Sequence, residues 1–114
     1  MKDDKPYLLH IRESIARILC FTEEGKRAFF ADIRTQDAVI RNLQVLAEST
    51  QRLSESTKAH HPDVPWQAIS GFRNVVVHGY LGIDLNQIWL IVDQNLLDLQ
   101  GQVETMLRNL EQSP

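Results

Sequence analysis

The chain has 114 residues, of which 43% are hydrophobic and 24% charged, and its formal net charge is −3. This length suits one compact domain with one core and is too short for two domains of normal size. The acidic balance argues against a protein that coats nucleic acid with a uniformly basic surface, although it leaves room for a small basic groove. We expect a single domain over residues 1–114.

The start of the chain, MKDDKPYLLH, contains no secretory signal, and no apolar run is long enough to span a membrane. The single cysteine, Cys20, cannot form an intramolecular disulfide. A lone cysteine of this kind is more often a small core residue than a nucleophile. These features predict a cytoplasmic protein in a reducing environment that makes no contact with a membrane.

Apolar residues at intervals of three and four predict a first amphipathic helix over residues 4–22. Asp3 or Asp4 is expected at its N-cap. Gly25 then interrupts the pattern, and the stretch KRAFFAD is expected to form one or two helical turns.

A second long helix is predicted from the same spacing over about 35–54, starting at Thr35. Glu48 is expected on or near its apolar stripe, which is an unusual place for a carboxylate. The polar segment SESTKAHHPDVP follows, and a short helix in it should end before Pro62.

Residues 73–83 allow two interpretations. Three consecutive valines have strand propensity and HGYLG resembles a turn, so this segment alone could be a β-hairpin. The spacing of Trp66, Ile69 and Phe72 favours instead a helix that starts near Pro65 and ends near His78.

The last helical pattern begins at Asp84, the expected cap, and Gly101 or the polar run DQN is expected to bend or divide it. Helical periodicity thus dominates the whole chain, and we predict an all-α bundle of four or five helices.

The run RNVVVHGY, residues 73–80, combines an arginine, a histidine and a tyrosine in the pattern R-x4-H-x-Y, with the polar Asn74 directly after the arginine. In a small helical chain, after PW and before GYLGID, this run resembles the signature of HEPN-domain ribonucleases. The resemblance to the HepT-like toxins of HepT/MntA toxin–antitoxin pairs covers nearly the whole chain, through MKDDKPYLLHI, AFFADIRTQDAVIRNLQVLAEST and HPDVPWQAISGFRNVVVHGYLGIDLNQIW.

The resemblance implies an endoribonuclease that needs no metal or cofactor and uses the 2′-hydroxyl of the RNA as nucleophile. Histidine suits both proton transfers because its ordinary pKa lies near neutrality. Arginine suits the phosphate because its planar guanidinium donates two parallel hydrogen bonds and keeps its charge. We therefore assign His78 and Arg73 as catalytic residues, with Asn74 in support of the phosphate or the imidazole.

Five residues along a helix correspond to about 140° of rotation, so Arg73 and His78 do not share a face. HEPN proteins typically dimerise, which implies a homodimer with a composite cleft and an isologous interface. In HepT-like toxins the tyrosine that matches Tyr80 accepts adenylyl groups from a cognate minimal nucleotidyltransferase antitoxin, MntA. The resemblance implies the same partner and the same modification here, which would oppose RNA through bulk and like charge.

Less specific roles stand beside these assignments. Arg73 with His78 could be a surface arginine and a helix-capping histidine, and Tyr80 a structural aromatic. Glu48 could face Arg73 or the dimer groove, but an ion pair with Arg52 at i+4 fits better. The whole chain could also be an inactive HEPN module that binds a nucleotidyltransferase, or a plain oligomerisation domain.

The remaining polar and aromatic residues suggest no further site. His10, His60 and His61 have no metal-ligand spacing, so we expect no zinc site. The tryptophans should pack in the fold. Phe29 and Phe30 could stack on bases, although the core or a dimer contact is the better assignment.

Overall fold

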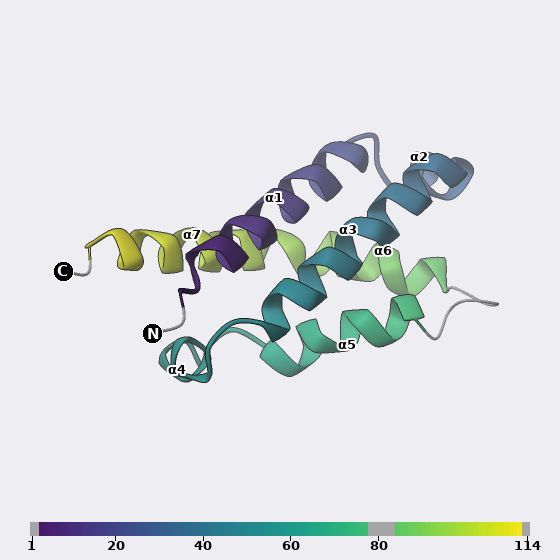
Figure 1. Cartoon of the computed structure of the whole chain (residues 1–114). Helices are drawn as coiled ribbons and strands as arrows, with labels where there is room; N and C mark the ends of the chain where they lie inside the picture. The colour runs from purple at the N-terminus through teal and green to yellow at the C-terminus, as the bar shows by residue number, and fades with distance from the viewer. Residues whose placement is uncertain (1–2, 78–83, 113–114) are drawn as a thin grey trace.

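The computed structural model of the chain describes residues 3–77 and 84–112, with the side chains of 74–77 and 112 left aside. This part of the chain forms seven helices and no strand (Figure 1). Five helices have ten or more residues, and two have six. They are α1 Lys5–Phe21, α2 Lys26–Ala31, α3 Ile33–Gln51, α4 Glu55–His60, α5 Trp66–Val77, α6 Leu85–Gln94 and α7 Leu96–Gln112. The predicted all-α class is confirmed, and so are both short helices.

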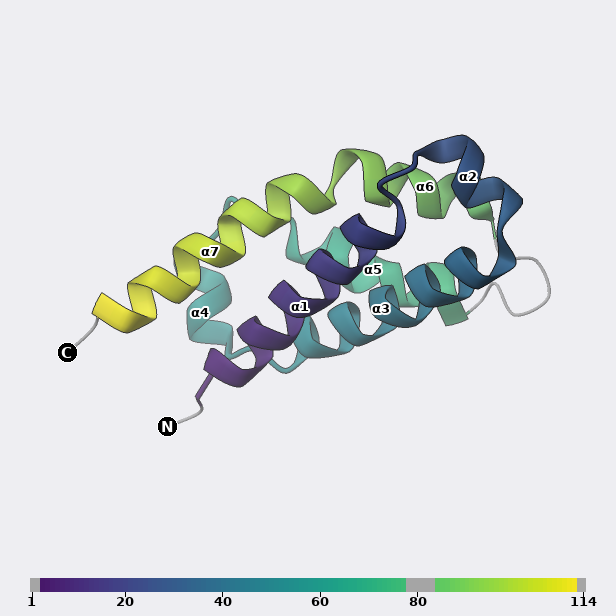
Figure 2. The same cartoon turned by 90° about the horizontal axis from the view of Figure 1, so that it is seen from above.

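Helix α3 is the centre of the arrangement. It packs against α1 on one side and α5 on the other (Figure 1), while α7 packs along α1 (Figure 2). The short α4 and α2 lie at opposite ends of α3. The start of α1 and the end of α7 lie at the same end of the bundle, which measures 48 × 26 × 21 Å (Figures 1 and 2).

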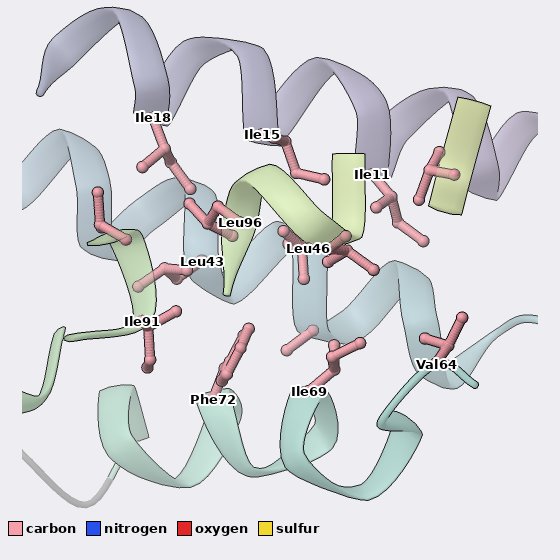
Figure 3. Packing of buried hydrophobic residues seen from close by; sticks show 14 of the residues in the cluster. Ile11, Ile15, Ile18, Leu43, Leu46, Val64, Ile69, Phe72, Ile91 and Leu96 are labelled. Atoms are coloured by element: carbon pink, nitrogen blue, oxygen red, sulfur yellow. The ribbon is translucent and has the colours of Figure 1, made fainter. Parts of the chain in front are cut away.

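The core is formed by apolar side chains that these helices turn toward one another (Figure 3). Helix α1 contributes Ile15, α3 contributes Leu43 and Leu46, and α5 contributes Ile69 and Phe72. None of the five is more than 5% exposed. Full burial of such a side chain stabilises the fold by about 1.5–3 kcal/mol. Helix α5 is therefore held firmly by one face, which fixes the direction of its other residues.

Helix α3 begins two residues earlier than the spacing predicted because Asp32 caps it. The Asp32 carboxylate accepts hydrogen bonds from the Thr35 hydroxyl at 2.8 Å and the Arg34 backbone N–H at 3.0 Å. These bonds, the Thr35 hydroxyl first, hold the pKa of Asp32 below its ordinary value. The helix also ends earlier than expected, at Gln51, with Arg52 as its C-cap.

Asp4 occupies the N-cap position of α1, as expected, but its side chain does not cap that helix. The carboxylate is 6% exposed and accepts hydrogen bonds from the Ser54 backbone N–H at 2.9 Å and the Ser54 hydroxyl at 2.7 Å. The Thr57 hydroxyl donates a further bond to it. Asp4 thus joins the start of α1 to the start of α4, fifty residues away in the chain.

The last helical region divides at the polar run DQN, which is one of the two positions predicted for a bend or division. Helix α6 ends at Gln94 and α7 starts at Leu96, whereas Gly101 lies inside α7. The carboxylate of Asp84 caps α6, as expected, and accepts from the Asn86 backbone N–H at 3.0 Å. No helix in the described ranges is long and apolar enough to cross a membrane.

Candidate active site

Arg73 lies on α5, directly after a residue that anchors this helix in the core. Ile69 and Phe72 are 2% and 5% exposed and point toward α3 (Figure 3). A step of one residue turns a helix by about 100°, so Arg73 leaves the buried face and is exposed. The packing of Phe72 thereby fixes the backbone position from which the Arg73 side chain extends.

The guanidinium of Arg73 reaches the C-terminal end of α3. Its Nη1 donates a hydrogen bond to Oε1 of Gln51, with the two atoms 3.3 Å apart. Together with Glu48 and Arg52, these two residues line an open pocket of about 400 Å³, which we call the arginine pocket. Arginine, glutamine and glutamate side chains from two packed helices therefore meet at one place on the surface.

The charges of the arginine pocket are not compensated by ion pairs. Within residues 3–77 and 84–112, the ion pairs up to 4.0 Å are Arg12–Glu104, Arg17–Glu13 and Lys58–Glu55. The prediction of an ion pair between Glu48 and Arg52 is therefore wrong. A guanidinium that is not paired with a carboxylate remains available to bind a phosphate.

Glu48 does not lie on the apolar stripe of α3, in contrast to the prediction. It is exposed, whereas Leu46, Ala47, Ser49 and Thr50 are buried. The apolar spacing of α3 admits small polar residues on the buried face, and the Thr50 hydroxyl is satisfied there by the Leu46 carbonyl at 2.9 Å. Because the buried face of α3 includes the residues on both sides of Glu48, Glu48 lies on the opposite face and points outward.

The other members of the predicted site fall at the end of α5 and beyond it. His78 and Tyr80 lie outside the described residues, and Asn74 lies on α5 but its side chain is not described. Helix α5 extends through Val77, so the helical interpretation of 73–77 is confirmed and the β-hairpin is wrong. His78 is the next residue in the sequence after this helix. The roles of His78, Asn74 and Tyr80 stay predictions.

Phe29, Trp66 and Trp89 are packing residues, as expected. Phe29 is 1% exposed, and its ring centroid lies 5.4 Å from those of both Phe30 and Trp89. Trp66 is half-buried, and its Nε1 donates to the carbonyls of Lys58 at 3.1 Å and His61 at 3.0 Å. Phe29 therefore belongs to the core and is no platform for a base.

Cys20 is exposed, so its assignment to the core is wrong. The buried face of α1 consists of Leu8, Ile11, Ser14, Ile15 and Ile18. A position two residues after Ile18 is turned by about 200° and faces away from the core. Cys20 does not line the arginine pocket.

A second pocket, of about 470 Å³, lies between α1, α4 and α7. His60 and His61 line it, but Arg73, the residue of the run RNVVVHGY whose side chain is described, does not. Within the described ranges, no three His, Cys, Asp or Glu side chains are grouped so that they could hold a metal ion. The arginine pocket is thus the described surface that contains a residue of the predicted site.

A family model described as Ribonuclease HepT-like matches residues 11–106. The chain belongs to the HepT-like ribonuclease family. The matched region contains the arginine pocket and the whole run from Arg73 to Tyr80.

Two curated relatives of this HepT-like chain match it over almost their full length. A protein of Thermococcus cleftensis named "Probable ribonuclease HepT" is 33% identical over 92% of this chain and 96% of its own. A "Putative RNase" of Methanocaldococcus jannaschii is 32% identical over 96% of this chain and 92% of its own. No solved structure matches at a significant level. The resemblance to HepT-like proteins is thus confirmed at the level of the family.

Proposed function

We propose that this HepT-like chain is a metal-independent endoribonuclease in which Arg73 and His78 act on one phosphodiester of RNA. The observation that carries the proposal is the exposed guanidinium of Arg73. It lines an open pocket and has no carboxylate partner among the described residues, on helix α5, whose last residue, Val77, precedes His78 in the sequence. Membership of a ribonuclease family supplies the class of substrate.

The reaction needs two proton transfers and one stabilised charge. The imidazole of His78 accepts the proton of the 2′-hydroxyl, and the 2′-oxygen forms a bond to phosphorus. The bond from phosphorus to the 5′-oxygen then breaks, and an imidazolium donates a proton to the leaving oxygen. The products are a 2′,3′-cyclic phosphate and a free 5′-hydroxyl. Arg73 donates hydrogen bonds to the non-bridging oxygens, where negative charge increases in the transition state.

We propose that the complete site forms between two copies of the chain. If the helix continued through His78, positions five residues apart would be turned by about 140° around its axis, and one copy would present Arg73 and His78 in different directions. A two-fold axis near the end of α5 would bring two arginines and two histidines together from a single motif. Acid and base in the reaction could then be the histidines of different copies.

We further propose that the chain is the toxin of a toxin–antitoxin pair and that Tyr80 is its switch. The cognate partner is an MntA-like minimal nucleotidyltransferase. The phenolic oxygen of Tyr80 attacks the α-phosphorus of ATP bound to this partner, pyrophosphate leaves, and the phenolic proton passes to a base. The added phosphate is two residues from His78 in the sequence and repels an RNA phosphate there.

The test of the nuclease compares purified wild type, Arg73→Gln and His78→Ala on RNA in the presence of EDTA. We expect wild type to cleave and to leave 2′,3′-cyclic phosphate ends, and both variants to lose at least about a hundredfold in rate. His10→Ala is the matched control, because His10 is an exposed histidine on α1. Wild type and His78→Ala that cleave equally would remove the catalytic role of His78.

Separate measurements test the proposed dimer and the proposed modification of Tyr80. Light scattering should give the mass of a dimer at micromolar concentration, and a monomer that cleaves RNA would contradict the composite cleft. After coexpression with the nucleotidyltransferase, mass spectrometry should find the mass of AMP on Tyr80. A modified protein that still cleaves RNA at the full rate would contradict the switch.

A further inference from the structure

The arginine pocket contains a second guanidinium that the proposed reaction does not use. Arg52 is the C-cap of α3, is exposed, and lines the pocket together with Arg73. It takes part in none of the ion pairs formed within the described ranges. Among the described residues of the lining, Glu48 is the acidic one, and these residues carry one more positive than negative charge.

The position of the pocket makes a second cation necessary for an anionic ligand. It lies at the C-terminal end of α3, where unpaired carbonyl groups carry a partial negative charge. This end of the helix repels a phosphate, and Glu48 repels it as well. Arg73 alone would have to overcome both, whereas two guanidinium groups leave a net attraction.

Gln51 orients Arg73 without removing its charge. Its Oε1 is an amide oxygen and accepts one N–H of the guanidinium at 3.3 Å. A carboxylate at the same place would form an ion pair with Arg73 and compete with a phosphate for the same donors. A neutral acceptor restricts the side chain and leaves the remaining N–H groups for a ligand.

From these contacts we propose that the arginine pocket binds the backbone of the RNA strand. Arg73 contacts the scissile phosphate, Arg52 contacts a neighbouring phosphate of the same strand, and Gln51 is a positioning residue for Arg73. The proposal rests on the proposed ribonuclease function for the identity of the ligand. It adds a substrate contact outside the run RNVVVHGY and gives a role to the end of α3.

The first test measures binding of a 2′-O-methyl RNA, which cannot be cleaved, by fluorescence anisotropy at several salt concentrations. Arg52→Gln should bind about tenfold more weakly, the typical effect of one charged hydrogen bond. Its plot of log affinity against log salt should be shallower by about 0.7 because one phosphate contact is lost. Arg41→Gln is the matched control, an exposed arginine on the same helix that makes the same change in charge. It should leave the slope unchanged.

The second test changes Gln51 without changing its shape. Gln51→Glu should form an ion pair with Arg73, weaken binding by about tenfold and slow cleavage, while the melting temperature stays near that of wild type. Gln67→Glu adds the same charge at an exposed position of α5 outside the pocket and should bind like wild type. Glu48→Gln should bind RNA more tightly because it removes a negative charge from the lining of the pocket.

The outcomes separate this inference from the nuclease proposal. Arg52→Gln with unchanged affinity and slope would overturn the inference, even if His78→Ala abolished cleavage. A wild type that does not bind the modified RNA would overturn it as well. Weaker binding by Arg52→Gln and Gln51→Glu would support it, even if wild type cleaved no RNA and the nuclease proposal failed.

Discussion

The contact between Asp4 and the start of α4 gives the sharpest prediction on stability. Three donors, the backbone N–H and hydroxyl of Ser54 and the hydroxyl of Thr57, converge on a carboxylate that is 6% exposed. Asp4→Ala removes their acceptor and leaves a space that water reaches poorly. We expect this substitution to detach the start of α1 from the connection between α3 and α4.

The expected loss follows from the geometry. A hydrogen bond to a charged group contributes about 1.5–3 kcal/mol, but these three bonds share one acceptor and do not add. The Ser54 hydroxyl already lies 3.1 Å from that of Thr57, so the two hydroxyls can partly satisfy each other. The Ser54 N–H then remains without a partner. We therefore expect about 3 kcal/mol in total, which for 114 residues lowers the melting temperature by about 12 °C.

The assay is thermal unfolding followed by circular dichroism at 222 nm, with Asp3→Ala as control. Asp3 is the neighbouring carboxylate, is exposed, and accepts a hydrogen bond from the Lys5 backbone N–H at 3.0 Å. Its removal should cost less than about 1 kcal/mol, or about 4 °C. Equal melting temperatures of the two variants would refute the assignment of a special role to Asp4.

Three further substitutions test the packing and one cap. Phe29→Ala should lower the free energy of unfolding by about 3–5 kcal/mol in urea denaturation, because the ring is 1% exposed, whereas Phe21→Ala, at an exposed position, should cost less than about 1 kcal/mol. Trp66→Phe should cost about 1 kcal/mol in the same assay, because two carbonyls at the end of α4 lose the indole N–H. Since the folded pKa of Asp32 is depressed, its contribution to stability is present above its unfolded pKa and is lost as the pH falls through the folded value. Asp32→Asn should therefore show a smaller loss of melting temperature between about pH 5 and pH 2 than wild type does.

The sequence allowed the helices to be predicted because their apolar residues recur at the spacing of one helical face. Leu8, Ile11, Ile15 and Ile18 follow this rule, and α1 extends over nearly the predicted residues. The prediction of which residues are buried was wrong where small polar side chains form part of the buried face of a helix. The spacing of apolar residues alone predicts Glu48 near the stripe of α3, whereas the buried face also includes the polar Ser49 and Thr50. Local spacing identifies a helix more reliably than it identifies which of two neighbouring positions is buried.

From the sequence, only those residues of the candidate site that lie close together in the chain could be predicted. The run RNVVVHGY drew attention to Arg73, which is exposed and lines a pocket. The partner of Arg73 could not be found in this way, because Gln51 is 22 residues away and has no distinctive neighbours. The link from Asp4 to Ser54, 50 residues away, was missed for the same reason. Both contacts follow from how α1, α3 and α5 pack, and one sequence contains no direct signal for such pairs.

The acidic net charge of the chain and the charge of the arginine pocket lead to one expectation about binding. A chain with a net charge of −3 repels RNA over most of its surface, so attraction must come from local cations. Arg52 and Arg73 lie where packed helices hold them together, and neither is paired with a carboxylate within the described ranges. Binding should then depend on few phosphate contacts and decrease gently with salt, unlike that of a protein with a broad basic surface. A steep dependence on salt in wild type would mean that cations outside the arginine pocket bind most of the RNA.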